Sequence, residues 1–423
     1  MSDHATRRRG ARRVAPAVLG LLLALSLPAA EAVAGGAGPV TRTVYRGSAW
    51  GTMLKQHQGV ESGHSAPATL SCLTKPGQAY RNSVASIRAP QNVFHTGLIV
   101  DKAESLPIQD GVETAQSTSV IHDVSMIQGV IHAQVIKGVT ATSRKNGTYR
   151  FSTAGSQFGQ LTINGQVFAQ PAENRVVELP GLGRVTLFET GHAVHDGMAV
   201  SYVNMLRVEI LHPNDQGIPV GTQIVMGHAL AGIVRSAGPL GGRAWGSRVS
   251  VGNSLESGPS FTTYLPCPGT NGKLIKQSGA ATSLPAPIRV GSVTNTAVGS
   301  VGKLVTSGET TSRIVDVNLG DGQITADLIK ADAAIQRKNG QITIDTSGSH
   351  FGSLFIQGQG QAAAPDPNTV IEIPGLGKVT LYEVTQARNF VIVRMFHLQV
   401  LQDNPDIPIG TDVVLGYAKV SVH

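Results

Sequence analysis

Residues 177–189 read VELPGLGRVTLFE, and residues 371–383 read IEIPGLGKVTLYE. In both stretches the turn sequence Pro-Gly-Leu-Gly separates two segments in which apolar and polar residues alternate. Proline fixes the φ angle of a tight turn, and glycine accepts the left-handed conformation that the turn needs. Each stretch therefore predicts two antiparallel strands, and their recurrence indicates that the chain contains two copies of one module.

The rarest residues of the chain repeat at the same interval. Trp50 and Trp245 are its only tryptophans, Cys72 and Cys267 are its only cysteines, and both pairs are 195 residues apart. A fixed internal period decides the architecture before any local pattern is considered. A duplicated scaffold is more typical of a binding or structural module than of an enzyme with one active site.

The repeat also includes a hairpin signal. The tetrapeptide Arg-Lys-Asn-Gly occurs at residues 144–147 and again at residues 337–340. Asn-Gly is the strongest short signal for a two-residue β-turn, because both residues accept a positive φ. After the second copy, Ile342 and Ile344 alternate with polar residues, which is the period of a strand.

These patterns predict an all-β protein with two tandem, homologous, β-sandwich-like (jelly-roll-like) domains. We expect the domains at residues 35–235 and 236–423, with Arg235–Gly242 as the linker between them. A β-solenoid is the alternative architecture, but its period of roughly 20–30 residues is absent.

The composition agrees with short strands and tight turns. The chain has 50 glycines and 41% apolar residues, but only 14% charged and 4% aromatic residues. Its formal net charge is +7, and five of its arginines lie in residues 1–34. The remaining charge is mildly basic and forms no focused patch, so we expect no nucleic-acid partner.

Residues 1–34 predict a secretory signal peptide. Arginines at residues 7–13 precede the apolar run 14–27, and Ala32–Ala34 offers a small-residue cleavage site. The run is shorter than the roughly 20 residues that span a membrane. We therefore expect export and a mature chain without a transmembrane segment. Residues 419–423 read as a strand without a sorting signal, which favours release or non-covalent retention at the cell wall.

The even number of cysteines in an exported chain favours a disulfide. Cys72 and Cys267 are equivalent residues of the two copies, and such residues meet only near a pseudo-twofold axis. Three states remain open: a bridge between them, a separate thiol in each domain, and an intermolecular bridge.

Trp50 and Trp245 are the candidates for a ligand platform. An exposed indole ring can stack on a sugar, whereas a buried one would anchor the core of a domain that has few aromatic residues. Whether the two indoles are exposed or buried therefore distinguishes a carbohydrate-binding module from a purely structural domain.

Candidate catalytic groups are few. Glu189 and Glu383 end equivalent strands, and Asp123 and Asp316 are the carboxylates that could complete a polysaccharide hydrolase. Such an enzyme needs its two carboxylates about 5–10 Å apart. Solvent-facing or turn-capping glutamates are the alternative, and they are the interpretation that we favour.

The other polar residues predict no site. His192 and His195 have the spacing of a ligand pair but lack the rest of a metalloprotease pattern, and the second copy has no counterpart. Ser65, Ser260 and Ser300 lie in Gly/Ser-rich stretches without a nucleophile elbow or a recognisable base. We expect no catalytic residue, no metal and no cofactor.

Several segments together resemble the choice-of-anchor P family of exported bacterial surface proteins. They are residues 177–187 and their second copy, Gly322–Asp327, Leu265–Gly269 and Gly410–Gly416. The resemblance covers both repeats and is fuller in the second, because the first departs from it at Gly129–Gln134 and Ser71. It implies a secreted or surface location and supplies no catalytic residue.

The sequence thus predicts a secreted or cell-surface protein with a structural or adhesive role at the bacterial envelope. We expect it to be non-enzymatic, with cell-envelope components or further copies of itself as partners. A pair of carbohydrate-binding modules is the alternative function, followed by a polysaccharide hydrolase.

Overall fold

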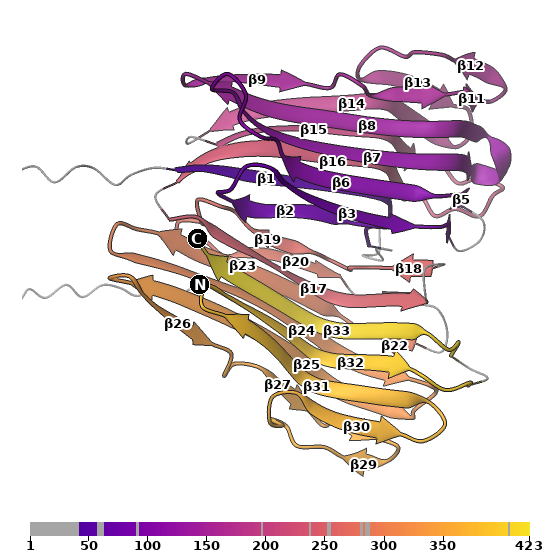
Figure 1. Ribbon diagram of the computed structural model, residues 1–423. Coiled ribbons are helices and arrows are strands. Elements are labelled where there is room, and N and C mark those ends of the chain that lie inside the picture. Colours follow the sequence, from indigo (N-terminus) through magenta and orange to yellow (C-terminus); the bar gives the residue numbers. More distant parts are fainter. Residues whose placement is uncertain are drawn as a thin grey trace, which may run out of the picture. The chain divides into compact units, whose positions relative to one another are not determined.

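The computed structural model describes residues 42–56, 63–89, 93–195, 198–236, 238–251, 255–279, 282–283, 288–404 and 407–423 (Figure 1). For residues 255–257 and 282–283 only the backbone is described. The predicted signal peptide, residues 1–34, lies outside these ranges. No helix in the described part of the chain is long and apolar enough to cross a membrane.

The first repeat consists of two antiparallel sheets (Figure 1). The first, six-stranded sheet has the order β13-β14-β15-β16-β1-β2. Its strands are β1 (Arg42–Lys55), β2 (Ala68–Leu73), β13 (Arg175–Leu179), β14 (Gly183–His195), β15 (Met198–Ile210) and β16 (Gln223–Ser236). The second, ten-stranded sheet consists of β3 (Gln78–Val84), β4 (Ile87–Arg88), β5 (Phe94–Thr96), β6 (Ile99–Ser105), β7 (Glu113–Met126), β8 (Ile131–Lys145), β9 (Thr148–Ser152), β10 (Gln157–Gly159), β11 (Leu161–Ile163) and β12 (Gln166–Phe168). One 3₁₀ turn, η2 (Ile127–Gly129), connects β7 to β8.

The second repeat has the same two-sheet construction. Its seven-stranded sheet contains β17 (Leu240–Val251), β18 (Leu255–Ser257), β19 (Thr263–Leu265), β30 (Thr369–Ile373), β31 (Gly377–Ala387), β32 (Phe390–Val400) and β33 (Thr411–Val422). Its ten-stranded sheet contains β20 (Ile275–Gly279), β21 (Thr282–Ser283), β22 (Ile288–Val290), β23 (Val293–Val301), β24 (Val305–Leu319), β25 (Ile324–Lys338), β26 (Gln341–Asp345), β27 (His350–Gly352), β28 (Phe355–Ile356) and β29 (Gln359–Gly360). The prediction of an all-β chain with two sandwich-like repeats is confirmed, and the described residues contain no α-helix.

The predicted hairpins lie where the sequence places them. Asn146 and Gly147 have φ angles of 49° and 85°, and Asn339 and Gly340 have φ angles of 51° and 81°. Two consecutive residues with positive φ form the mirror-image turn that suits the twist of a hairpin. They join β8 to β9 and β25 to β26, with Lys338 paired to Gln341 in the second copy.

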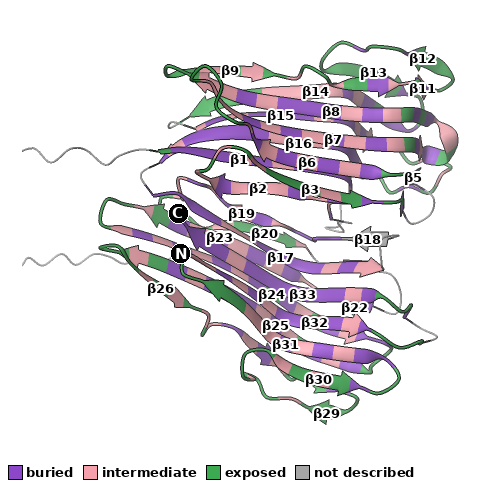
Figure 2. Cartoon of the chain, viewed as in Figure 1, coloured by how far each residue is buried: buried purple, intermediate pink, exposed green. Residues whose placement is uncertain are grey.

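Each repeat has its own apolar core between its two sheets (Figure 2). In the first repeat, β16 packs against β7 and β8, and in the second, β33 packs against β24 and β25. Three equivalent pairs of fully or almost fully buried residues show the correspondence: Ile121 and Ile314, Ile136 and Ile329, and Leu206 and Phe396. The expected linker Arg235–Gly242 is mostly strand, because β16 continues to Ser236 and β17 starts at Leu240.

The inward and outward alternation changes phase within two long strands of each sandwich. Phe188 and Tyr382 have φ angles of 50° and 48° in the middle of β14 and β31. On the neighbouring strand, both residues of Met205–Leu206 are buried, as are both residues of Met395–Phe396. Because the phase shifts there, residues three apart, instead of two, lie on the same outer face.

A disulfide joins the two repeats. Cys72 and Cys267 are bonded, with a Cα–Cα distance of 5.4 Å, and both are buried beside Val44 and Val234. Of the three cysteine states left open by the sequence, the structure has the bridge between the copies. Both repeats belong to one compact unit.

Candidate functional site

Trp50 is buried in a stack of rings. It is 7% exposed, and the ring centroids of His64 and His228 are each 4.4 Å from that of Trp50. The interplanar angles of 10° and 16° show that both contacts are stacked. A side chain that is so far buried offers no open surface on which a sugar ring could stack.

Trp245 is buried in an equivalent stack. It is 3% exposed and stacks on Tyr417 at a centroid distance of 4.5 Å. Tyr417 occupies the position of His228, because each pairs in register with the tryptophan of its repeat. Trp50 and Trp245, the candidates for a ligand platform, are thus both buried against neighbouring residues, and Trp50 also lines a cavity of about 270 Å³.

The two histidines beside Trp50 are held neutral. Burial lowers the pKa of His64 to about 4. Burial, with the nearby His64, lowers the pKa of His228 to about 3. The Nδ1–H group of His228 donates to Oδ1 of Asn204 at 2.6 Å, so a neutral ring has a defined partner. At neutral pH this stack carries no charge.

Glu189, the first candidate for catalysis, is held by its neighbours on β15. Arg207 Nη1 donates to Oε1 of Glu189 at 2.6 Å, and Asn204 Nδ2 donates to Oε2 at 2.7 Å. The phase change described above places Asn204 and Arg207 on the same face. We call this arrangement a cross-strand clamp, because both carboxylate oxygens accept hydrogen bonds from the neighbouring strand.

Glu383 lies in the equivalent clamp of the second repeat. Arg394 Nη1 donates to Oε1 at 2.6 Å, and His397 Nδ1 donates to Oε2 at 2.8 Å. His397 Nε2 is 2.7 Å from Oδ2 of Asp412, so one imidazole bridges two carboxylates. Hydrogen bonds to Asp412 and Glu383 raise the pKa of His397 to about 9, and the hydrogen bond from His397 lowers the pKa of Glu383.

The hydrolase pairing that the sequence suggested is not formed. Asp123 and Asp316 belong to the ten-stranded sheets, whereas Glu189 and Glu383 belong to the other sheets. Neither aspartate is among the described groups that bond to the glutamates. Each glutamate of the pair is therefore bonded within its own sheet, and its aspartate belongs to the other sheet of the sandwich.

The remaining sequence candidates have structural contacts. His192 stacks on Phe151 at 4.6 Å, and the described residues contain no cluster that could hold a metal ion. Ser65 Oγ accepts a hydrogen bond from Thr52 N at 2.7 Å. Ser260 Oγ accepts the equivalent bond from Ser247 N at 2.9 Å. Both serines therefore fasten a loop to the first long strand of their repeat.

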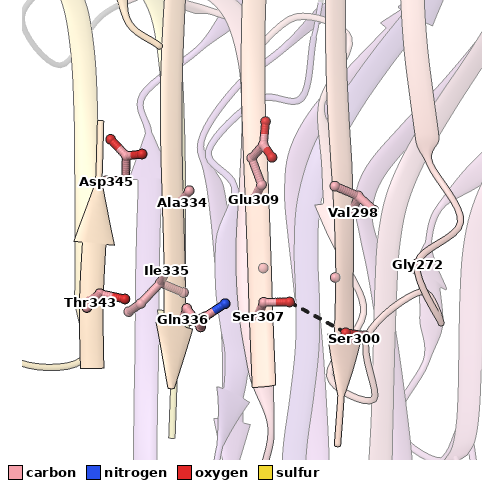
Figure 3. Close-up of a pocket in the computed structure, with 12 residues that line it drawn as sticks. Gly272, Val298, Ser300, Ser307, Glu309, Ala334, Ile335, Gln336, Thr343 and Asp345 are labelled. Atoms are coloured by element: carbon pink, nitrogen blue, oxygen red, sulfur yellow. Dashed lines mark hydrogen bonds between the residues drawn. The ribbon is translucent and has the colours of Figure 1, made fainter. Parts of the chain in front are cut away.

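A groove on the outer face of the second ten-stranded sheet is a site that the sequence analysis missed (Figure 3). Its volume is about 360 Å³, and its floor is formed by β23, β24, β25 and β26. The register aligns Val298, Glu309, Ala334 and Asp345 in one row across these strands. In Figure 3, Glu309 and Asp345 stand on either side of the small Ala334.

A second row lines the same groove with neutral polar groups. It contains Ser300, Ser307, Gln336 and Thr343, and the hydroxyls of Ser300 and Ser307 are 3.5 Å apart. Burial and the neighbouring Asp332 raise the pKa of Glu309. The groove thus combines carboxylates, hydroxyls and an amide on one sheet face.

The acidic groups of the groove belong to one repeat alone. The pairing of the first repeat places Gln116, Ala141 and Ser152 where the second has Glu309, Ala334 and Asp345. The duplication therefore preserved the sheet and changed the chemistry of its outer face.

Comparison with known proteins adds little. No family model and no curated protein matches the chain. A crystal structure of a mutant Transferrin Binding Protein B (TbpB), a vaccine antigen from Haemophilus parasuis Hp5, aligns with 91% of this chain and 76% of its own, at 10% identity and a TM-score of 0.10. A crystal structure of Acinetobacter baumannii OccAB2 aligns with 90% of this chain and 98% of its own, at 6% identity and a TM-score of 0.13. Neither similarity is close enough to support an argument about fold or function.

Proposed function

We propose that this chain is an exported, non-enzymatic protein with a structural or adhesive role at the bacterial envelope. The observation that carries the proposal is the buried disulfide between Cys72 and Cys267, which fastens the two sandwiches to each other. Structural disulfides persist in oxidising compartments outside the cytoplasm. The signal-peptide pattern of residues 1–34 and the resemblance to the choice-of-anchor P family favour the same location.

Cell fractionation under thiol-trapping conditions tests this proposal. An epitope-tagged full chain is expressed in a bacterial host, and its fractions are compared on gels with and without reductant. We expect the protein in the medium or on the envelope, with a mobility that changes on reduction in the wild type and not in C72S/C267S. A chain that stays in the cytoplasm with both thiols reduced contradicts the proposal.

Retention by the envelope is tested separately. Purified, oxidised protein is mixed with isolated cell envelopes and sedimented, and self-association is followed by analytical ultracentrifugation. We expect saturable co-sedimentation or a concentration-dependent increase in mass. A protein that remains monomeric and stays in the supernatant argues against an adhesive role.

Carbohydrate binding is a second candidate function, and we assign it to the groove because both indoles are buried. The observation that favours it is the pair of adjacent rows, one with two carboxylates and the other with hydroxyls and an amide, in a groove that also contains Gly299, Gly308 and Ala334. Polar groups of these kinds fix the orientation of sugar hydroxyls. Glu309 and Asp345 are the residues that we expect to contact the ligand.

A glycan array with matched variants tests the groove. E309Q and D345N should lose any binding that the wild type shows, while E178Q, at an exposed position of the first repeat, should keep it. Release of reducing ends from polysaccharides is measured in the same samples. Turnover that disappears in E309Q would instead support the hydrolase interpretation.

A further inference from the structure

A second cavity, of about 270 Å³, lies beside the disulfide, where residues of both repeats meet. Much of its wall is apolar, with Leu70, Leu230 and Leu265 next to both half-cystines. One cation, Arg46, also lines it, and no aspartate or glutamate is among its lining residues. A positive group in a largely apolar cavity is the feature that calls for an explanation.

Arg46 has no anionic partner among the described residues. Its stem packs over Gly232, where an added Cβ would lie 3.0 Å from Cγ of the arginine. Its Nη1 atom is 3.7 Å from Sδ of Met198, a weak acceptor. Desolvation lowers the pKa of this guanidinium, and the nearby Tyr264, which also lines the cavity, raises it. The side chain is partly buried, so an anionic partner would compensate for the water that its charge has lost.

Other donors stand near the same cavity. Arg243 Nη1 is 3.5 Å from Oγ1 of Thr69, a residue of the wall, and adds a second guanidinium behind it. Nδ1 of His64, which also lines the cavity, is buried and has no hydrogen-bond partner in the described part of the chain. Among the polar groups of the wall, Arg46 is the cation and His64 Nδ1 lacks a partner, whereas Thr69 and His228 have hydrogen-bond partners.

We propose that this cavity binds a small organic carboxylate with an apolar body, such as an aromatic acid. The guanidinium of Arg46 presents a planar fork that matches a carboxylate, and such charge-assisted pairs are the strong ones. The leucines and the disulfide cover the apolar part of the ligand. The volume of about 270 Å³ suits a molecule of about the size of benzoate.

Calorimetric titration of the oxidised full chain with benzoate and benzamide tests the proposal. The two ligands have the same shape and differ in charge, so the comparison needs no variant. We expect benzoate to bind at least tenfold more tightly than benzamide. Equal affinities, or no heat from benzoate at millimolar concentration, would overturn the proposal.

Variants then assign the binding to Arg46. R46Q should weaken the affinity for benzoate at least tenfold. R46K keeps the charge but loses the planar fork of the guanidinium, so its affinity should lie between those of R46Q and the wild type. R81Q removes an exposed arginine of β3 and should leave the affinity unchanged. The circular dichroism spectrum of each variant reports whether it is folded. Benzoate affinity that is the same in folded R46Q as in the wild type refutes the assignment.

Discussion

At the residue level, the two repeats keep one carboxylate and exchange the groups around it. Glu189 and Glu383 occupy the same position, but the arginine lies at residue 207 in one copy and at residue 394 in the other. Asn204 of the first repeat occupies the position of Arg394, and His397 of the second repeat occupies the position of Arg207. What the two copies share is a glutamate with both oxygens bonded across strands. A shared clamp of this kind favours a structural role for the glutamates.

The clamp of the second repeat should make stability fall at alkaline pH. The pKa of His397 rises from 6.5 to about 9 in the folded chain, so its contribution is complete below pH 6.5 and is lost between pH 6.5 and 9. H397R places at this position the residue of the first repeat, which stays charged over that range. We expect thermal melts to show a smaller loss of Tm between pH 6.5 and 9 for H397R than for the wild type. Parallel pH profiles for the two proteins would contradict this explanation.

The stack around Trp50 should have the opposite pH dependence. The folded pKa values of His64 and His228, about 4 and about 3, lie below the ordinary value of 6.5. Protons then bind more readily to the unfolded chain, so stability is complete above pH 6.5 and declines as the pH falls toward 4.

The variant H228Y tests this decline, because Tyr417 is the residue at that position of the second repeat. Denaturant titrations at pH 7 and pH 4.5 measure the acid loss, which is the decrease in the free energy of unfolding between these two pH values. We expect a smaller acid loss in H228Y than in the wild type. The exposed His195 provides the control, because H195Q should leave the acid loss unchanged. An acid loss in H228Y equal to that of the wild type is the result that would exclude this cause.

Part of the groove could be derived from the sequence. The Asn339-Gly340 turn pairs Lys338 with Gln341, and counting back along both strands brings Ala334 opposite Asp345. Placing Glu309 in the same row requires the register between β24 and β25. That register depends on which residues form the loop between these two strands. A comparison of the two copies reveals only the carboxylates that both share, whereas this groove is acidic in one copy only.

At the level of elements, the hairpin turns are the part of the fold that local chemistry determines. Gly340 has a φ of 81°, and no atom lies within 4 Å of a Cβ added there, so the cost of a side chain is conformational alone. G340A should therefore lower the free energy of unfolding by about 1–2 kcal/mol. Chemical denaturation measures the loss.

G360A is the matched control for the turn. Gly360 does not have a positive φ, and an added Cβ would make only ordinary contact with Phe355, at 3.6 Å. We expect a change of less than about 0.5 kcal/mol. If G340A and G360A lower the free energy of unfolding by the same amount, the turn does not require the left-handed conformation.

The phase change in the long strands could not be predicted from the sequence. Phe188 and Tyr382 have positive φ angles, which bulky residues rarely adopt. Strict alternation, the rule used for strands, would place Asn204 and Arg207 on opposite faces of β15. The long-range packing of the sandwich overrides that local preference and creates the clamps. The turns, the repeats and the all-β class follow from local signals, whereas these clamps depend on tertiary structure.

For the whole molecule, the disulfide is a covalent constraint that links the first repeat to the second. A bridge across 195 residues removes much of the freedom of the unfolded chain. Loss of the bridge in C72S/C267S should lower the free energy of unfolding by about 2–5 kcal/mol. Calorimetry of the oxidised wild type and the double variant measures this. Reductant should bring the wild type to the Tm of the variant, and an unchanged Tm would mean that the repeats hold together without the bond.

Equivalent residues of the two copies touch each other elsewhere too, since Gly63 packs directly against Gly258. Together with the bridge, this contact has the symmetry of an isologous homodimer, in which the same patch faces itself. One repeat by itself carries one cysteine on this patch, so two separate copies arranged in this way would be joined by a single symmetric disulfide. In the tandem chain the same joint lies within one molecule, and the residues on either side of it differ.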